Sequence, residues 1–262
     1  MIHSLAFVHP DAKIGKNVKI DPFAYIEQDV EIGDDCWVGS NASILSGARI
    51  GKSCKIFQGA VIAAIPQDLK FNGEESYVII GNHTTVREHA TINRGTKAGP
   101  ETKVGSHCLI MAYAHVAHDC VLGDHVILAN AATLAGHVEI GDWAIIGGLC
   151  AVHQFVKIGA HTLISGGSLV RKDVPPYIKA ASEPLAYAGI NSIGLSRRDY
   201  NEEQINNIAS AYRILYQQGL NISQAASQIQ SEFVSSPEIE NILSFINESD
   251  RGLIKKRIRE EE

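Results

Sequence analysis

Aliphatic residues recur at every sixth position along most of the first two thirds of the chain. From Val104 to Val170, twelve successive sixth residues are Val, Ile or Leu, and the same spacing runs from Ile14 to Ile62 and over residues 80–92. A period of six suits neither an α-helix nor a simple alternating strand. It predicts a parallel β-helix of hexapeptide repeats, in which short strands joined by turns wrap a core of aliphatic side chains.

A second position, four residues after each aliphatic one, carries mostly Val, Ala or Cys. Such small side chains are what a tight interior corner accepts. All five cysteines occupy it: Cys36, Cys54, Cys108, Cys120 and Cys150. We therefore predict that the cysteines are small buried residues rather than disulfide partners, zinc ligands or nucleophiles. Glycine often follows the aliphatic residue directly, as at Gly105 and Gly123, and we expect it to supply unusual dihedral angles at a turn.

The repeat stops twice, at 64–78 (AIPQDLKFNGEESYV) and at 97–103 (KAGPETK). Interruptions of a solenoid are loops ejected from its wall, and such loops often carry function. We therefore expect residues 1–182 to form the β-helix, with two ejected loops.

The composition changes after Pro175-Pro176, and apolar residues over 205–215 then follow helical three-and-four spacing. We expect residues 183–262 to form a small α-helical domain. The boundary signals are a capping-box pair at Asp199 and Glu202, a helix stop at Gly219, and the start of a last helix at Ser236-Pro237.

Composition and charge narrow the class of protein. The 262 residues are 45% hydrophobic and 20% charged, which is ordinary for a globular protein, and the formal net charge of −6 argues against a nucleic-acid binder. The N-terminal residues show no secretory signal, and no run approaches the roughly 18 apolar residues of a membrane helix. We expect a cytoplasmic protein without an integral membrane segment.

The hexad pattern resembles the left-handed β-helix of hexapeptide acyltransferases, in which three hexads form one coil. The resemblance implies the left hand; the spacing alone does not. Positions 18 apart then lie above one another, which gathers polar residues of three coils on one face: His115, His118, His137, His153 and Gln154. Five other histidines, each three residues after an aliphatic position, are expected to be solvated turn residues: His83, His89, His107, His125 and His161.

Three chemistries could use this histidine patch. The patch could be a stack of polar residues on the wall of a scaffold that only displays loops. Three imidazoles could hold zinc if a subunit interface brought them together, as in γ-class carbonic anhydrases, which share this fold type. One imidazole, oriented by a carboxylate, could act as a general base, and His118-Asp119 supplies such a pair. Adjacent side chains of a strand point apart, so this pair requires a turn or a second chain.

The chain as a whole closely resembles the UDP-N-acetylglucosamine O-acyltransferases, the family that catalyses the first step of lipid A synthesis. The matching segments are AHVAHDCVLGDHVILANAATLAGHVEIGDWAIIGGLCAVHQFVKIGAH at 114–161, QDLKF at 67–71, REHATINRGT at 87–96, DVPPY at 173–177 and RGLI at 251–254. The resemblance implies transfer of a β-hydroxyacyl chain from acyl carrier protein to the 3-hydroxyl of UDP-N-acetylglucosamine. The thioester donor is already activated, so no metal or other cofactor is expected.

The family's catalytic residues fall on three positions of this sequence. His118 matches the general base, and Asp119 matches the carboxylate that orients it. Gly136 matches the residue whose backbone N–H faces the developing oxyanion. An imidazole near its own pKa can accept the proton of a sugar hydroxyl as the new bond forms.

The resemblance also implies substrate-binding residues. Those expected on the first loop, around the sugar and acyl chain, and near the nucleotide are Asp68, Lys70, His115, His137, His153, Gln154, Asn191, Arg197 and Arg198. Ile193 stands where the family typically has a carboxylate, so contacts to the uridine are expected to differ. Gly166 matches the position that gates acyl length, and together with Leu163 it predicts an open groove for a hydroxymyristoyl or longer chain.

The family further implies a homotrimer with active sites between neighbouring subunits. Docking of the acidic acyl carrier protein requires a local basic patch, for which the candidates are Arg197, Arg198, Arg213, Lys255, Lys256, Arg257 and Arg259. A sister N-acyltransferase typically carries an additional N-terminal uridine-binding domain. Here the repeat begins by Ile14, so we expect the O-acyltransferase.

Overall fold

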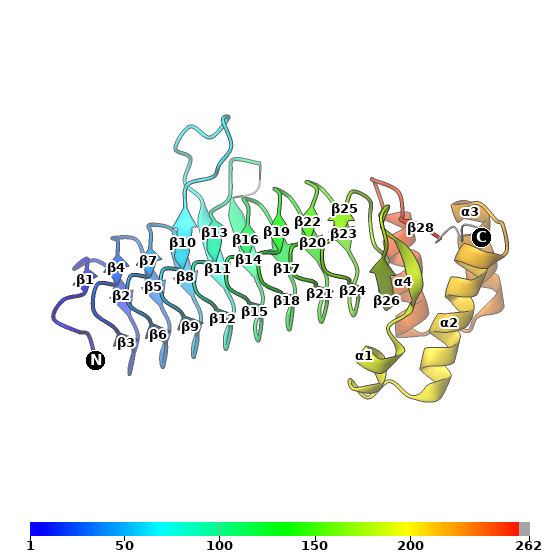
Figure 1. Cartoon of the computed structure of the whole chain (residues 1–262), viewed down its shortest axis with the longest axis horizontal. Coiled ribbons are helices and arrows are strands. Elements are labelled where there is room, and N and C mark those ends of the chain that lie inside the picture. The colour runs from blue at the N-terminus through cyan, green and yellow to red at the C-terminus, as the bar shows by residue number, and fades with distance from the viewer. Residues whose placement is uncertain (99, 257–262) are drawn as a thin grey trace.

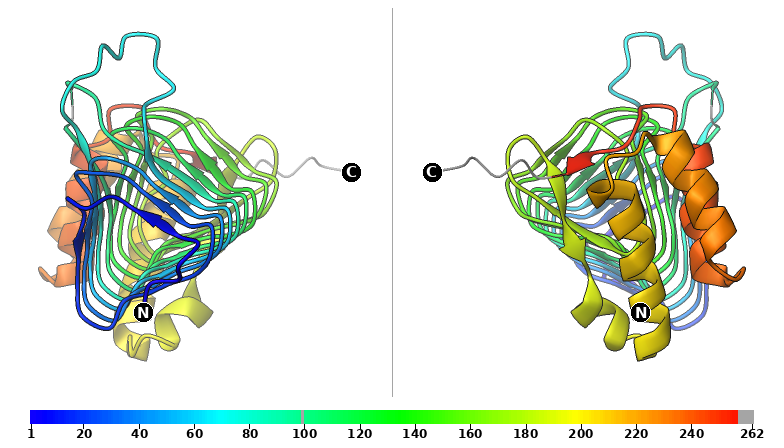
Figure 2. Two further views of the ribbon diagram at one scale, coloured as in Figure 1. Left: turned by 90° about the vertical axis from the view of Figure 1, so that its left-hand side faces the viewer. Right: turned by 90° about the vertical axis from the view of Figure 1, so that its right-hand side faces the viewer.

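A computed structural model of the chain describes residues 1–98 and 100–256, and it shows a long three-sided prism with helices at one end (Figures 1 and 2). Its walls are three sheets, called A, B and C below. Sheet B contains β1 (Phe7–Val8), β4 (Tyr25–Ile26), β7 (Ser43–Ile44), β10 (Val61–Ala64), β13 (Thr91–Asn93), β16 (His115–Val116), β19 (Thr133–Leu134), β22 (Ala151–Val152) and β25 (Leu169–Val170).

Sheet C contains β2 (Lys13–Ile14), β5 (Glu31–Ile32), β8 (Ala48–Ile50), β11 (Tyr77–Ile80), β14 (Glu101–Val104), β17 (Val121–Leu122), β20 (Glu139–Ile140) and β23 (Lys157–Ile158). The prism part of sheet A contains β3 (Lys19–Ile20), β6 (Trp37–Val38), β9 (Lys55–Ile56), β12 (Thr85–Val86), β15 (Leu109–Ile110), β18 (Ile127–Leu128), β21 (Ile145–Ile146) and β24 (Leu163–Ile164). The chain visits sheets B, C and A in turn, which is the left-handed parallel β-helix that the hexad pattern and the family resemblance predict.

The core lies inside the prism and is built from the period-six residues. In a two-residue strand the side chains point to opposite faces, so the second residue of each strand faces inward. Val116 pairs with Leu134, Leu134 pairs with Val152, and all three are buried. The repeat of 18 residues per coil therefore places the aliphatic residues of successive coils above one another along the axis of the prism. The five cysteines are buried free thiols, as predicted.

The turns differ from the expectation in one respect. Glycines that follow the aliphatic residue are not the residues with a positive φ; that conformation falls two positions later, as at Asp119 (φ 60°) and His161 (φ 59°). Glycine is required instead by the close approach of the next coil, because a Cβ at Gly105 would lie 2.3 Å from the carbonyl oxygen of Gly123. The unusual dihedral angles are carried by Asn, Asp, His and even aromatic residues.

Two loops leave the prism on the same side, at the top of Figure 1. The first connects β10 to β11 and the second connects β13 to β14. Strand β14 begins at Glu101, inside the range 97–103 expected to be loop. At the base of the loops, β11 and β14 pair over four residues, which anchors both loops firmly to the wall.

The C-terminal part closes the open end of the prism. Sheet A continues through β26 (Ile178–Ala181), β27 (Ala186–Ile190) and β28 (Lys255–Lys256), and the helices are α1 (Ser192–Ser196), α2 (Glu202–Gln217), α3 (Ile222–Glu232) and α4 (Pro237–Asn247). Ser236 occupies the N-cap position of α4 without a side-chain capping hydrogen bond, Pro237 begins this helix, and Gly219 follows α2, as predicted. The capping box of α2 is formed by Asn201 and Gln204, not by the expected Asp199 pair, because Asp199 has a positive φ outside the helix.

Tyr212 of α2 joins this helix to the prism. It is fully buried, and its hydroxyl donates a hydrogen bond to the carbonyl oxygen of Pro176 at 2.6 Å. Helix α3 and the strands after β25 carry no hexad signal and were not predicted. In the described part of the chain, none of the helices combines the length and apolar character needed to cross a membrane.

Candidate active site

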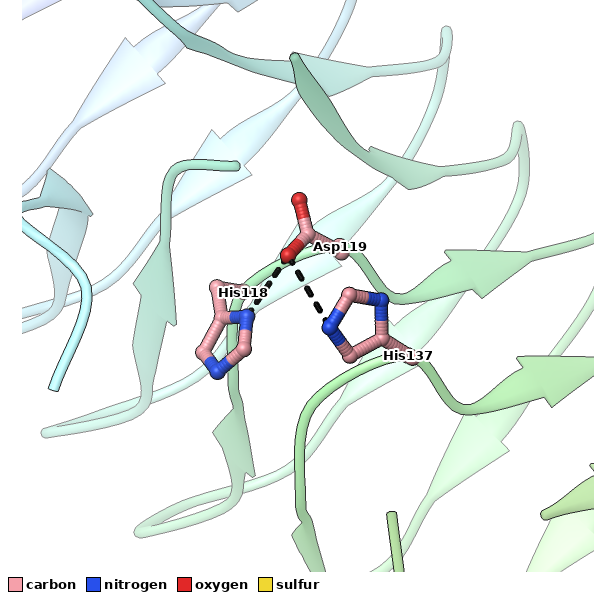
Figure 3. A group of neighbouring side chains, drawn as sticks. All are labelled: His118, Asp119 and His137. Carbon is pink, nitrogen blue, oxygen red and sulfur yellow. Dashed lines mark hydrogen bonds and ion pairs between the residues drawn. The ribbon is translucent and has the colours of Figure 1, made fainter. Parts of the chain in front are cut away.

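His118 and Asp119 form a close pair although they are adjacent in sequence (Figure 3). Consecutive side chains of a strand point apart, but Asp119 follows β16 in a turn and has a φ of 60°. The turn brings Oδ2 of Asp119 to 2.7 Å from Nδ1 of His118. Because a carboxylate only accepts hydrogen bonds, Nδ1 carries the ring proton, and Nε2 presents a lone pair on the far side of the ring.

Asp119 is held by two threonines, one immediately before the second interruption and one within it. The Thr96 N–H donates to Oδ1 at 2.7 Å, and the Thr96 hydroxyl donates to Oδ2 at 2.7 Å. The Asp119 N–H donates to the Thr102 hydroxyl at 2.9 Å. The carboxylate is buried and fixed in orientation, so it can hold the His118 ring in turn. Sequence reasoning missed both threonines; the one available signal was that Thr96 ends the segment REHATINRGT, immediately before the repeat is interrupted.

His137 belongs to the next coil and approaches the same carboxylate. Its Nε2 lies 3.4 Å from Oδ2 of Asp119, its ring meets the His118 ring edge-on at 5.1 Å, and Phe155 stacks on it at 4.6 Å. Ligand atoms of His118, Asp119 and His137 all lie within 4.8 Å of one another. Two imidazoles and a carboxylate are a ligand set that a transition metal could use. The arrangement can therefore serve as a general base or as a metal site.

Gly136 lies against the Cε1–Nε2 edge of the His118 ring. A Cβ at this position would be 2.5 Å from Cε1 and 2.6 Å from Nε2 of His118, so a larger residue would displace the ring. The N–H at the equivalent position of other turns donates to an acidic side chain of the following coil, as Lys16 does to Asp34, Ser106 to Asp124 and Asp124 to Asp142. Here the following coil offers Gln154, and the Gly136 N–H donates no hydrogen bond within the described residues.

The remaining patch residues lie on the same face. His115 is half-buried, its Nδ1 is 2.7 Å from the Thr91 hydroxyl, and burial, with a smaller contribution from His118, lowers its pKa. His153 and Gln154 are exposed one coil beyond His137. The predicted alignment of these residues on one wall is thus present in the structure.

A first cleft of about 470 Å³ lies between the two loops and the wall. Its lining includes Asp68, Lys70, Thr96 and His137. The Asp68 carboxylate accepts a hydrogen bond from the Lys70 N–H at 3.0 Å, which folds the first loop locally. The first loop therefore supplies its predicted residues to the neighbourhood of the His–Asp pair.

A second cleft of about 360 Å³ lies at a different corner, between sheets C and A, under α1. Its lining includes Asn191, Arg197, Arg198, Leu163 and Ile193. In Figures 1 and 2, α1 lies on the side of the prism opposite to the ejected loops. One chain thus holds the predicted site residues in two separate groups.

Gly166 belongs to neither cleft. It lies in the turn after β24, where a Cβ would be 3.1 Å from the carbonyl oxygen of Gly148 in the preceding coil. Leu163 of β24, its predicted partner, lines the second cleft.

His161 contradicts the expectation of a solvated turn residue. It packs edge-on against Tyr200 at 5.2 Å and lies beside Arg198, because the helical domain covers this turn. Arg198 in turn lies over the Trp143 ring, with 5.0 Å between the guanidinium carbon and the ring centroid.

A parallel β-helix of hexapeptides that presents an oriented imidazole beside a cleft is typical of hexapeptide-repeat transferases. The family model "Bacterial transferase hexapeptide (six repeats)" matches residues 11–36, 29–64 and 101–136. The model "Udp N-acetylglucosamine O-acyltransferase; Domain 2" matches residues 173–254, which include the helices.

Comparison with known proteins is more specific. The chain is 54% identical to the acyl-(acyl-carrier-protein)–UDP-N-acetylglucosamine O-acyltransferase of Trichlorobacter lovleyi, covering 97% of this chain and 99% of that one. It is 60% identical to the protein of the same name from Chlorobaculum tepidum, covering 93% of each. A solved UDP-N-acetylglucosamine acyltransferase from Bacteroides fragilis is 52% identical and superimposes with a TM-score of 0.96, covering 97% of this chain and 100% of that chain.

The chain therefore belongs to the acyl-(acyl-carrier-protein)–UDP-N-acetylglucosamine O-acyltransferase family, and it is an acyltransferase.

Proposed function

We propose that the protein transfers a β-hydroxyacyl chain from acyl carrier protein to the 3-hydroxyl of UDP-N-acetylglucosamine, a step of lipid A biosynthesis, with His118 as general base. The names of its relatives supply the donor and acceptor. The assignment of His118 as the general base is supported by the hydrogen bond of 2.7 Å between His118 Nδ1 and the buried Asp119 carboxylate. It leaves Nε2 free to accept a proton.

The proposed reaction is a direct acyl transfer. Nε2 of His118 accepts the proton of the sugar hydroxyl while that oxygen attacks the thioester carbonyl carbon. The Gly136 N–H donates to the oxyanion that develops, a contribution of about 3 kcal/mol in comparable sites. Collapse of the tetrahedral intermediate breaks the carbon–sulfur bond, and the protonated imidazole returns its proton to the departing thiolate.

The competing metal site shares Asp119, and its geometry favours the base. Oδ2, the oxygen nearest to both imidazoles, already accepts the Thr96 hydroxyl proton at 2.7 Å and the His118 Nδ1–H at 2.7 Å. A metal ion there would have to displace hydrogen bonds to a buried carboxylate, which is costly.

The proposed acceptor site combines the two clefts. Asp68, Lys70, His115, His137, His153 and Gln154 surround the sugar and acyl chain, and Asn191, Arg197 and Arg198 take the nucleotide, where guanidinium groups suit a diphosphate. Because these two groups lie at different corners of one chain, we infer that neighbouring subunits complete each site, in a homotrimer.

The acyl chain and its carrier are the remaining parts of the proposal. Gly166 and Leu163 leave room for a hydroxymyristoyl or longer chain. Lys255 and Lys256 of β28 are exposed and, with Arg197, Arg198 and Arg213, are candidates to dock the acidic acyl carrier protein. Arg257 and Arg259 lie outside the described residues. We place the reaction in the cytoplasm, since five free thiols suit a reducing compartment.

The decisive experiment is acyl transfer by metal-free protein, comparing the wild type with His118→Ala and, as a matched control, His83→Asn. His83 is an exposed turn residue with a positive φ, a conformation that Asn tolerates. We expect robust wild-type turnover, an unchanged control, and a fall of about 100- to 10,000-fold in kcat for His118→Ala. Turnover that requires added zinc, or a His118→Ala variant that remains active, would overturn the base assignment.

A further inference from the structure

The guanidinium of Arg198 in the second cleft contacts two neutral side chains. Its Nη1 lies 3.3 Å from Nδ1 of His161, and the guanidinium lies over the Trp143 ring. Within residues 1–98 and 100–256, Arg198 forms no ion pair with a carboxylate. A half-buried arginine usually has such a partner, because an uncompensated charge is costly to desolvate. Burial accordingly lowers the pKa of Arg198.

His161 contacts a second group through its other ring nitrogen. Nε2 lies 3.3 Å from the hydroxyl of Tyr200. A guanidinium only donates, so Nδ1 must accept from Arg198, and the ring proton lies on Nε2 and points to the Tyr200 oxygen. Burial, and then the charge of Arg198, lower the pKa of His161 to about 4, while Asp142 raises it slightly. The imidazole is therefore neutral at physiological pH.

Two further residues fix the same turn. The Asn191 side chain donates to the His161 carbonyl oxygen at 2.9 Å, and the Tyr177 ring stacks on the imidazole at 5.5 Å. Tyr177 is itself fixed by the Asn241 side chain of α4, which donates to its hydroxyl at 2.9 Å. The imidazole thus cannot turn away from Arg198 without breaking contacts to the helical domain.

We propose that His161 is a positioning residue: it accepts a hydrogen bond from Arg198 without neutralising it, so that the guanidinium keeps its full charge for the phosphate groups of the acceptor. This inference rests on the proposed function of the second cleft. A carboxylate at the same place would hold Arg198 equally well in space but would compete with the phosphates for its charge. A side chain without a hydrogen-bond acceptor would leave the charge of Arg198 unchanged but would not hold its guanidinium in position.

Three substitutions separate these contributions. His161→Asn keeps a neutral hydrogen-bond acceptor close to the position of Nδ1. His161→Asp places a carboxylate there, in a side chain of the same size and shape as asparagine. His161→Phe keeps the stacked ring but removes both nitrogens. All three residues suit the turn: Asn and Asp tolerate the φ of 59°, and Phe155 already occupies the equivalent turn one hexad earlier with a φ of 64°.

The assay measures KM for UDP-N-acetylglucosamine and kcat, with UDP binding by calorimetry as a second readout and thermal melting as a check of folding. We expect His161→Asn to keep KM within about threefold, and His161→Asp and His161→Phe to raise it by roughly tenfold or more, with kcat little changed, since tenfold is the effect of one modest polar interaction. The Kd for UDP should rise in parallel.

Equal KM values for the Asn and Asp variants would overturn the proposal, because a purely structural role affects both alike. If His161→Asp fails to fold, the KM values of the His161→Asn and His161→Phe variants still test the proposal. An unchanged KM in His161→Phe refutes it. If the wild-type protein binds UDP but transfers no acyl chain, the proposed function is wrong. The Kd values of the variants for UDP would still test the positioning role of His161.

Discussion

Replacing Gly136 by alanine would disturb one side chain and little else. The added Cβ would lie 2.5 Å from Cε1 of His118, and real Cβ contacts are not shorter than about 3.0 Å. Gly136 does not have a positive φ, so alanine fits its backbone without strain. Alanine also keeps the backbone N–H, so the proposed oxyanion donor remains. The His118 ring must therefore move.

The magnitude of the effect follows from the size of this movement. Restoring an ordinary van der Waals contact requires a shift of about 1 Å, and a misplacement of that size costs roughly 100-fold in rate, or about 2.7 kcal/mol of transition-state stabilisation. Stability should change little. An off-rotamer imidazole costs about 0.5–1.5 kcal/mol, whereas a compatible Gly-to-Ala change gains about 0.4–1 kcal/mol through the unfolded state.

The assay is kcat/KM for acyl transfer, with urea unfolding measured alongside. Gly148→Ala is the matched control, because Gly148 has the same hexad position and a Cβ there meets only the Asn130 carbonyl oxygen, at 3.2 Å. We expect the Gly136→Ala variant to lose about 100-fold and the control to lose almost nothing. The double variant Gly136→Ala with His118→Ala should be no worse than His118→Ala alone.

Full activity in the Gly136→Ala variant would contradict this prediction, since it would mean that the reaction does not depend on the His118 ring at its observed position. Independent, additive losses in the double variant would mean that Gly136 acts through something other than His118.

Thr96→Val should lower kcat by roughly tenfold or more, because it removes a hydrogen bond to the Asp119 carboxylate worth about 1.5–3 kcal/mol; Thr96→Ser should restore the rate, and equal rates for both would contradict this role. Tyr212→Phe should lower the free energy of unfolding in urea by about 1–3 kcal/mol, because the Pro176 carbonyl oxygen loses its buried partner; an unchanged midpoint would count against it. The pKa of His161 is lowered to about 4 from an ordinary value near 6.5. Between these values only the unfolded chain binds the proton, so the free energy of unfolding decreases as the pH is lowered from about 6.5 to about 4. His161→Asn should lose less stability there in urea titrations at several pH values, and parallel losses would refute the assignment.

Much of the fold could be predicted because its repeating unit is short. A period of six sets each strand, each turn and each inward side chain, and every coil packs mainly on its two neighbours. The inward position of Cys120 or Leu134 thus follows from residue spacing alone. The family resemblance added the hand of the helix and the proposed roles of His118 and Gly136.

The site could be predicted only in part, because its contacts cross the interruptions of the repeat. The pairing of His118 with Asp119 depends on a left-handed turn residue that spacing does not reveal. Thr96 reaches Asp119 across 23 residues by way of the second loop, and no period relates the two.

The period of six predicted the strands, the turns and the core, since each of these follows from local periodicity. The three hexads per coil that the family resemblance implies then predicted the alignment of the histidines on one wall. Which polar groups contact one another depends on how distant parts of the chain pack together. His161 joins Arg198 across 37 residues, and β28 joins β27 from the far end of the chain. Such contacts depend on how the helical domain docks on the last coil, and side-chain packing between unlike elements sets that geometry.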